Sequence, residues 1–183
     1  MPANRFGGGA RTNENGLRFE QETSLKDSLI NAGYVVNRQN IVHNQHGTRL
    51  GMIASKYDFY SNLLRQEDIR WQDYISKQLL PDEAFLNFTN DTVYIIEKKF
   101  QNTSGSVDEK LQTCDFKKRQ YQKLLRDTNY DVEYLYVCND WFAQYCYRDV
   151  HNYIHSVGCH IFFNEIPLDF LELPPADQEY TYG

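Results

Sequence analysis

The chain has 183 residues, a formal net charge of −6 and an aromatic content of 15%. This length is typical of one domain with a real hydrophobic core, and so many aromatic residues exclude disorder as the default interpretation. The overall negative charge argues mildly against a nucleic-acid binder, but residues 98–126 hold 8 Lys and Arg against 3 Asp and Glu, so a basic segment lies within an acidic chain.

The N-terminal part of the sequence predicts a flexible arm, one helix and a long insertion. Residues 1–16 are rich in Gly and Asn, which is typical of a flexible arm. Apolar residues recur at helical spacing over 17–32, so we expect an amphipathic helix there. The insertion covers residues 34–80, with a strand at 34–36, a loop at 39–51 and helical structure at 57–80.

Strands and helices alternate in the rest of the chain. In order, we expect strands at 84–88 and 92–101, a helix at 106–126, a strand at 132–138, a helix at 141–157 and a strand at 159–163. A capping box of Ser106 and Glu109 opens the first of these helices. This order predicts an α/β (α+β) fold, a central mixed β-sheet flanked by helices, in one domain at 17–171. The acidic tail at 172–183 is expected to be loose.

The strand at 92–101 reads TVYIIEKKFQ, so a buried apolar run leads directly into Glu97, Lys98 and Lys99. An unpaired charge on a buried strand is costly, and these charges therefore need a partner or a chemical purpose. In a hairpin with a two-residue turn, Asp82 lies opposite Lys99 on the neighbouring strand. One face of the sheet then holds Asp82, Glu97, Lys99 and Gln101, and the other face holds Glu83 and Lys98.

Two carboxylates on adjacent strands can bind one metal ion. As diagonal neighbours, Asp82 and Glu97 are separated by roughly 7–8 Å at Cα, so their oxygens can converge on one cation that relieves their repulsion. Oxygen ligands with room for water favour Mg²⁺, and Mn²⁺ can substitute. Lys99 at the edge of such a site can orient an attacking water, whose pKa the ion lowers.

The letters PD at 81–82, followed after 14 residues by EKK at 97–99, resemble the PD-(D/E)xK signature of the restriction-endonuclease-like nuclease superfamily. The resemblance implies an α-β-β-β-α-β core with the signature acids on adjacent strands of a hairpin. It also implies that Asp82 and Glu97 are the metal ligands and that Lys99 is the catalytic lysine.

The same superfamily often places a further carboxylate on its first helix. In this sequence Glu20 fits that place, with Glu22 as the alternative. The resemblance therefore implies Glu20 as an additional catalytic metal ligand.

The function that the resemblance implies is that of a Mg²⁺-dependent, sequence-specific endodeoxyribonuclease. In-line attack on the DNA phosphodiester would leave 5′-phosphate and 3′-hydroxyl ends. The small size suits a type II restriction endonuclease that acts on double-stranded DNA as a homodimer, since one subunit cuts one strand. A homing endonuclease and a repair or junction-resolving nuclease of the same fold stay open. The alternative from another class is a non-catalytic DNA-binding protein with a degenerate nuclease fold.

Several polar residues around the signature are candidates for DNA contacts. Lys117 and Lys118 belong to a basic run in the helix after the signature, which either contacts phosphates or forms a solvated face. Ser104 and Ser106 precede that helix and either hold a phosphate through their amides or simply cap it. Gln101 lies at the mouth of the predicted site.

The four cysteines form no CxxC pair, which favours reduced thiols in a cytoplasmic protein over a disulfide framework. His151 and His155 are four residues apart, but the ligand spacings match no zinc finger. No signal-peptide pattern and no membrane-spanning apolar run occurs, so we expect no membrane partner.

Overall fold

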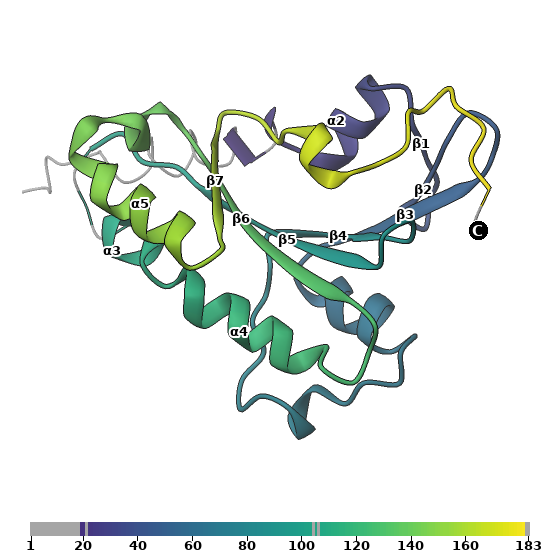
Figure 1. Cartoon of the computed structure of the whole chain (residues 1–183), viewed down its shortest axis with the longest axis horizontal. Helices are drawn as coiled ribbons and strands as arrows, with labels where there is room; N and C mark the ends of the chain where they lie inside the picture. The colour runs from purple at the N-terminus through teal and green to yellow at the C-terminus, as the bar shows by residue number, and fades with distance from the viewer. Residues whose placement is uncertain (1–18, 21, 104, 106, 182–183) are drawn as a thin grey trace, which may run out of the picture.

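The computed structural model describes residues 19–20, 22–103, 105 and 107–181. At its centre is a mixed seven-stranded sheet with helices on both faces (Figure 1), which confirms the predicted α+β class. The predicted arm at 1–16, Ser104, Ser106 and the capping box built on Ser106 lie outside the described residues. No helix within the described residues is long and apolar enough to cross a membrane.

The seven strands lie in the sheet in the order in which they occur in the chain. They are β1 (Val35–Val36), β2 (Ile41–His43), β3 (Arg49–Ala54), β4 (Glu83–Asn87), β5 (Thr92–Lys99), β6 (Asp131–Cys138) and β7 (His160–Phe163). Neighbours from β1 to β5 are antiparallel, whereas β6 is parallel to β5 and β7 is parallel to β6. Each parallel pair requires a crossover connection, which helices provide.

The described α-helices of known bounds are α2 (Leu25–Asn31), α3 (Val107–Leu111), α4 (Cys114–Leu124) and α5 (Arg148–Ser156). Single turns of π or 3₁₀ helix are η1 (Phe59–Leu64), η2 (Trp71–Asp73), η3 (Asp140–Ala143), η4 (Tyr145–Tyr147) and η5 (Leu168–Leu171). Helix α2 begins after Ser24, whose hydroxyl accepts a hydrogen bond from the amide of Asp27 at 3.3 Å. The crossover between β5 and β6 contains α4, and that between β6 and β7 contains α5.

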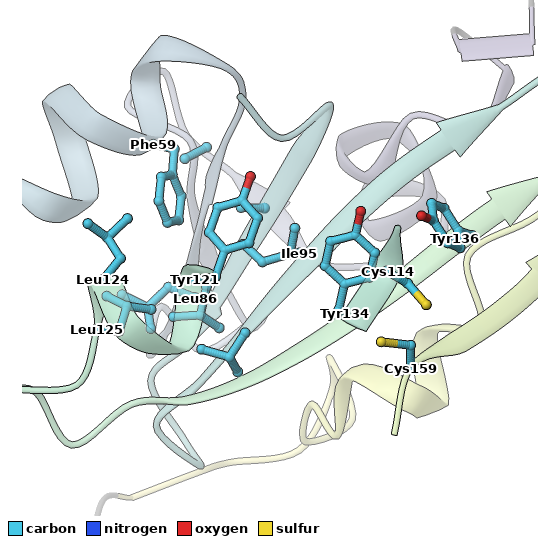
Figure 2. Close-up of a cluster of buried hydrophobic side chains, with 14 of the residues drawn as sticks. Phe59, Leu86, Ile95, Cys114, Tyr121, Leu124, Leu125, Tyr134, Tyr136 and Cys159 are labelled. Atoms are coloured by element: carbon cyan, nitrogen blue, oxygen red, sulfur yellow. The ribbon is translucent and has the colours of Figure 1, made fainter. Parts of the chain in front are cut away.

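The sheet separates two hydrophobic cores because successive residues of a strand face opposite sides. On one side, Val93 and Ile95 pack with residues of α4 and η1, and Figure 2 shows Phe59, Ile95, Tyr121 and Tyr134 gathered in this core. On the other side, Tyr94 and Ile96 pack with α2 and with the segment that contains η5. Figure 1 shows α2 and α4 on opposite sides of the sheet.

The prediction of a loop at 39–51 is wrong, because β2 and the first part of β3 lie there. β3 pairs with β4, so this segment is part of the central sheet. β2 has only three residues, and a strand so short shows no readable period; pairing with its neighbours stabilises it.

The helices predicted at 57–80, 106–126 and 141–157 are each wrong in extent. In the first region the helical structure is confined to residues 57–64 and η2; η1 carries most of the buried residues, and the rest is turn or irregular backbone. The second is interrupted between α3 and α4, and the third is α-helical only in α5.

The C-terminal tail is docked, contrary to the prediction that it is loose. The amide of Gln45 donates a hydrogen bond to the carbonyl of Ala176 at 2.8 Å, and the hydroxyl of Tyr34 donates to the carbonyl of Pro174 at 2.8 Å. The tail therefore covers the turn between β2 and β3, and these main-chain partners carry no signal in a sequence.

Candidate active site

The hairpin of β4 and β5 brings the signature residues to one end of the sheet. Ala84 pairs with Ile95 and Glu83 pairs with Ile96, and the turn at 88–91 has four residues where two were predicted. The pairing is thus shifted by two residues, which leaves every side chain on its predicted face because the side-chain period of a strand is two. Continued by one residue, this register places Asp82 opposite Glu97.

Asp82 lies immediately before β4 and is tied to β5 through its side chain. Its carboxylate Oδ2 accepts a hydrogen bond from the backbone amide of Lys98 at 2.8 Å. The preceding Pro81 has no amide hydrogen, while its carbonyl accepts a bond from the amide of Lys56 at 2.8 Å. The Asp82 carboxylate therefore takes the place of a strand carbonyl at the end of the β4–β5 ladder, which holds it beside Glu97 and Lys99.

The ammonium group of Lys99 lies among three oxygen atoms. It is 2.9 Å from Glu97 Oε2, 3.1 Å from the carbonyl oxygen of Lys98 and 3.9 Å from Asp82 Oδ2. The side chains of Glu97 and Lys99 are only 8% and 16% exposed, and the ring of Tyr136 lies 5.8 Å from the ammonium nitrogen. The structure thus brings together the three signature residues that the sequence predicted.

This oxygen set has the chemistry of a Mg²⁺ site, with the Lys99 ammonium standing where a cation would bind. Two carboxylates and one carbonyl are hard oxygen donors, and Mg²⁺ is held by one or two carboxylates while it keeps several waters. Within the described ranges, no group of three or more His, Cys, Asp or Glu side chains could hold a metal ion. These residues could hold Mg²⁺ only together with water ligands.

Glu83 and Lys98 form a buried ion pair on the opposite face of the hairpin. Lys98 Nζ lies 2.8 Å from Glu83 Oε2 and donates a hydrogen bond to the carbonyl of Glu20 at 3.0 Å. Both carboxylate oxygens of Glu83 accept from the amide of Leu25 at 3.2 Å. Burial raises the pKa of Glu83 above its ordinary value, and the charge of Lys98 opposes this shift. The pair attaches the N-terminal helical segment to the sheet, so Glu83 is engaged on the face away from Glu97 and Lys99.

Glu20 lies on the α2 side of the sheet, in one hollow with Asp82, Glu83 and Lys98. Its side chain is exposed, and Glu22 does not line this hollow. Glu97 and Lys99 are on the other face, so the structure places Glu20 near Asp82 and not near the rest of the signature. Glu20 could therefore bind only a metal ion that lies on the Asp82 side of the site.

The predicted DNA contacts have different surroundings. Lys117 lies 3.1 Å from Glu97 Oε2 and so belongs to the site itself, whereas Lys118 lies 3.2 Å from Glu133 and donates to the carbonyl of Gly158 at 2.6 Å. Gln101 is buried just after β5. Its backbone amide donates a hydrogen bond to Asn139 Oδ1 at 3.1 Å, and its backbone carbonyl accepts one from Asn139 Nδ2 at 2.7 Å. Sequence reasoning missed the contact of Lys117 with Glu97, whose only signal was the position of this lysine in the crossover helix.

Three buried tyrosines line the apolar side of Glu97. Burial, reinforced by the charge of Glu97, raises the pKa of Tyr121 and of Tyr134 far above the ordinary value. Burial likewise raises the pKa of Tyr136, whose hydroxyl donates to the carbonyl of Lys110 at 3.2 Å. These phenols stay neutral, so the Glu97 carboxylate faces cations on one side and a low-dielectric wall on the other, which strengthens its electrostatic interactions.

No family model, curated protein or solved structure matches this chain. The assignment of a function therefore depends on the residues and the geometry of the site.

Proposed function

We propose that this protein is a Mg²⁺-dependent endodeoxyribonuclease of the restriction-endonuclease-like kind. One observation carries the proposal: the oxygens of Asp82, Glu97 and the Lys98 carbonyl surround a single cationic position at the end of a hairpin. Like carboxylates held this close favour a bridging cation, and a lysine beside them is suited to phosphoryl chemistry.

The order of elements supports the same proposal. When the short strands β1 and β2 are set aside, helix α2, strands β3 to β5, helix α4 and strand β6 have the α-β-β-β-α-β order expected of that superfamily, with β6 parallel to β5. The predicted homodimer would present two such sites to a palindromic sequence in double-stranded DNA, one for each strand.

The chemistry assigned to the residues is as follows. Asp82 and Glu97 would hold the ion, whose chemistry would be to lower the pKa of a water and to neutralise charge on the phosphate. Lys99 would shift from between the carboxylates while staying in the site, and would donate hydrogen bonds to the attacking water and to a phosphate oxygen. Glu20 lines a hollow with Asp82 on the α2 side of the sheet, so it would contribute only from that side. In-line attack then leaves a 5′-phosphate and a 3′-hydroxyl.

The proposal is tested by cleavage of a mixture of plasmid and phage-genome DNA in Mg²⁺, in Mn²⁺ and in EDTA. We expect the wild type to cut only with a metal ion, and Glu97→Gln and Lys99→Met to cut about 10²–10⁴-fold more slowly. Asp149→Asn, on the exposed surface of α5, is the matched control and should cut like the wild type. DNA that stays intact in both metal ions would favour a non-catalytic DNA-binding protein, and variants as fast as the wild type would refute the site.

A further inference from the structure

Two lysines from different elements share one carboxylate oxygen. Lys99 of β5 lies 2.9 Å from Glu97 Oε2, and Lys117 of α4 lies 3.1 Å from the same atom. A carboxylate that is 92% buried thus receives a second ammonium group from the helix across the core, in addition to its neighbour on the strand. Such an arrangement requires a reason, because burying charge is costly unless the charges balance.

The charges of the site do balance without a metal ion. Asp82 and Glu97 contribute two negative charges, and Lys99 and Lys117 contribute two positive charges. A divalent cation placed among the same oxygens would therefore leave an excess of two positive charges in a low-dielectric setting. At least one ammonium group must leave when the ion binds, and an anion must then restore the balance.

Lys117 is the lysine better placed to leave. Its side chain is 26% exposed against 16% for Lys99, and within the described part of the chain it is paired with Glu97 alone. Lys99 also donates to the Lys98 carbonyl and lies over the ring of Tyr136. A lysine on a flexible four-carbon stem can move by several ångströms without movement of its helix.

We propose that Lys117 is a mobile counter-charge of the metal site. It neutralises Glu97 when no divalent cation is bound, and it pairs with a non-bridging oxygen of the DNA phosphate when the cation occupies the site. This inference rests on the proposed function and assigns Lys117 a phosphate-binding task that a static ion pair would not have. Removal of its charge therefore has two opposite effects: cation binding becomes tighter and cleavage becomes slower.

Titration calorimetry of the full chain with Mn²⁺ in the absence of DNA tests the first effect. Lys117→Met should bind Mn²⁺ on the order of tenfold more tightly than the wild type, because one competing charge is gone. Lys117→Gln, which keeps a polar side chain but no charge, should also bind Mn²⁺ more tightly than the wild type. Lys123→Met removes a lysine charge from an exposed position of the same helix and should leave the dissociation constant unchanged.

Cleavage at saturating Mn²⁺ tests the second effect, and we expect a loss of at least about tenfold for both Lys117 variants. Mn²⁺ affinity equal to or weaker than that of the wild type in both variants would overturn the inference and leave a static ion pair. A wild type that neither cuts DNA nor binds Mn²⁺ more tightly than Glu97→Gln would instead overturn the proposed function. The two failures are therefore distinguishable.

Discussion

The buried ion pair of Glu83 and Lys98 allows a test of which lysine of the signature is structural. In Lys98→Met, Glu83 keeps the amide of Leu25 as a donor but loses a cation at 2.8 Å. The side chains of Lys98 and Glu83 are only 4% and 15% exposed, so water can replace the lost partner only in part. Breaking a buried pair in this way costs about 3–5 kcal/mol of the free energy of unfolding. For a chain of this size, that loss lowers the melting temperature by roughly 6–20 °C.

The loss should depend on pH, because it leaves Glu83 as an uncompensated buried acid. Burial already raises the pKa of Glu83, and the loss of Lys98 raises that pKa further. A folded-state pKa above the unfolded value penalises the folded state at high pH, where the buried group must ionise, and the penalty disappears as the group becomes protonated. The destabilisation of Lys98→Met should therefore be larger at pH 8 than at pH 5.

Urea unfolding at pH 8 and at pH 5, followed by near-ultraviolet circular dichroism, measures both effects. The double variant Glu83→Leu/Lys98→Met removes both charges and should recover most of the lost stability. Lys99→Met, at the next position of β5, is the matched control: it should lose cleavage but less stability than Lys98→Met, because Glu97 keeps Lys117 as a partner at 3.1 Å. A destabilisation below about 1 kcal/mol for Lys98→Met, or a larger loss at pH 5 than at pH 8, would refute the assignment of a buried pair.

Two further predictions concern the hairpin and its neighbour in the sheet. Asp82→Asn keeps an oxygen that can accept a hydrogen bond from the Lys98 amide, so its urea midpoint should equal that of the wild type while metal-dependent cleavage is lost. Asp82→Ala should lose cleavage and also about 1–2 kcal/mol of stability. Equal urea midpoints for the two variants would contradict this hydrogen bond of the carboxylate. Gly51→Ala places a Cβ 2.4 Å from the Phe85 ring and 2.5 Å from the Leu86 carbonyl oxygen. We therefore expect the free energy of unfolding in urea to fall by about 1–3 kcal/mol. An unchanged free energy of unfolding would contradict the close approach of β3 to β4.

In the hairpin, periodicity predicts the face of each side chain but not the pairing of the strands. The predicted turn was two residues too short, yet Glu97 and Lys99 lie on the predicted face, because a shift of two residues preserves the alternation of a strand. The partner of Asp82 across the hairpin did change, from Lys99 to Glu97. A register therefore has to be read from the structure, although the faces followed from the sequence.

The errors in the fold have a common physical cause. β2 is stabilised by pairing with its neighbours β1 and β3, and the C-terminal tail by partners distant in the chain; a segment as short as β2 shows no periodicity of its own from which such pairing can be read. Conversely, the apolar spacing at 57–80 predicts one long helix, although η1 supplies most of the buried core residues of this region and the remainder is η2, turns and irregular backbone.

The sequence by itself determined the α+β class, the charged end of β5 and the residue types that suit a divalent cation. Local alternation and the chemistry of side chains are sufficient for these conclusions. Only the tertiary structure decided that Asp82 and not Glu83 approaches Lys99, that Lys98 is engaged in a buried pair, and that Lys117 contacts Glu97. Each of these contacts joins elements that the chain brings together only when the sheet and its crossover helix are folded.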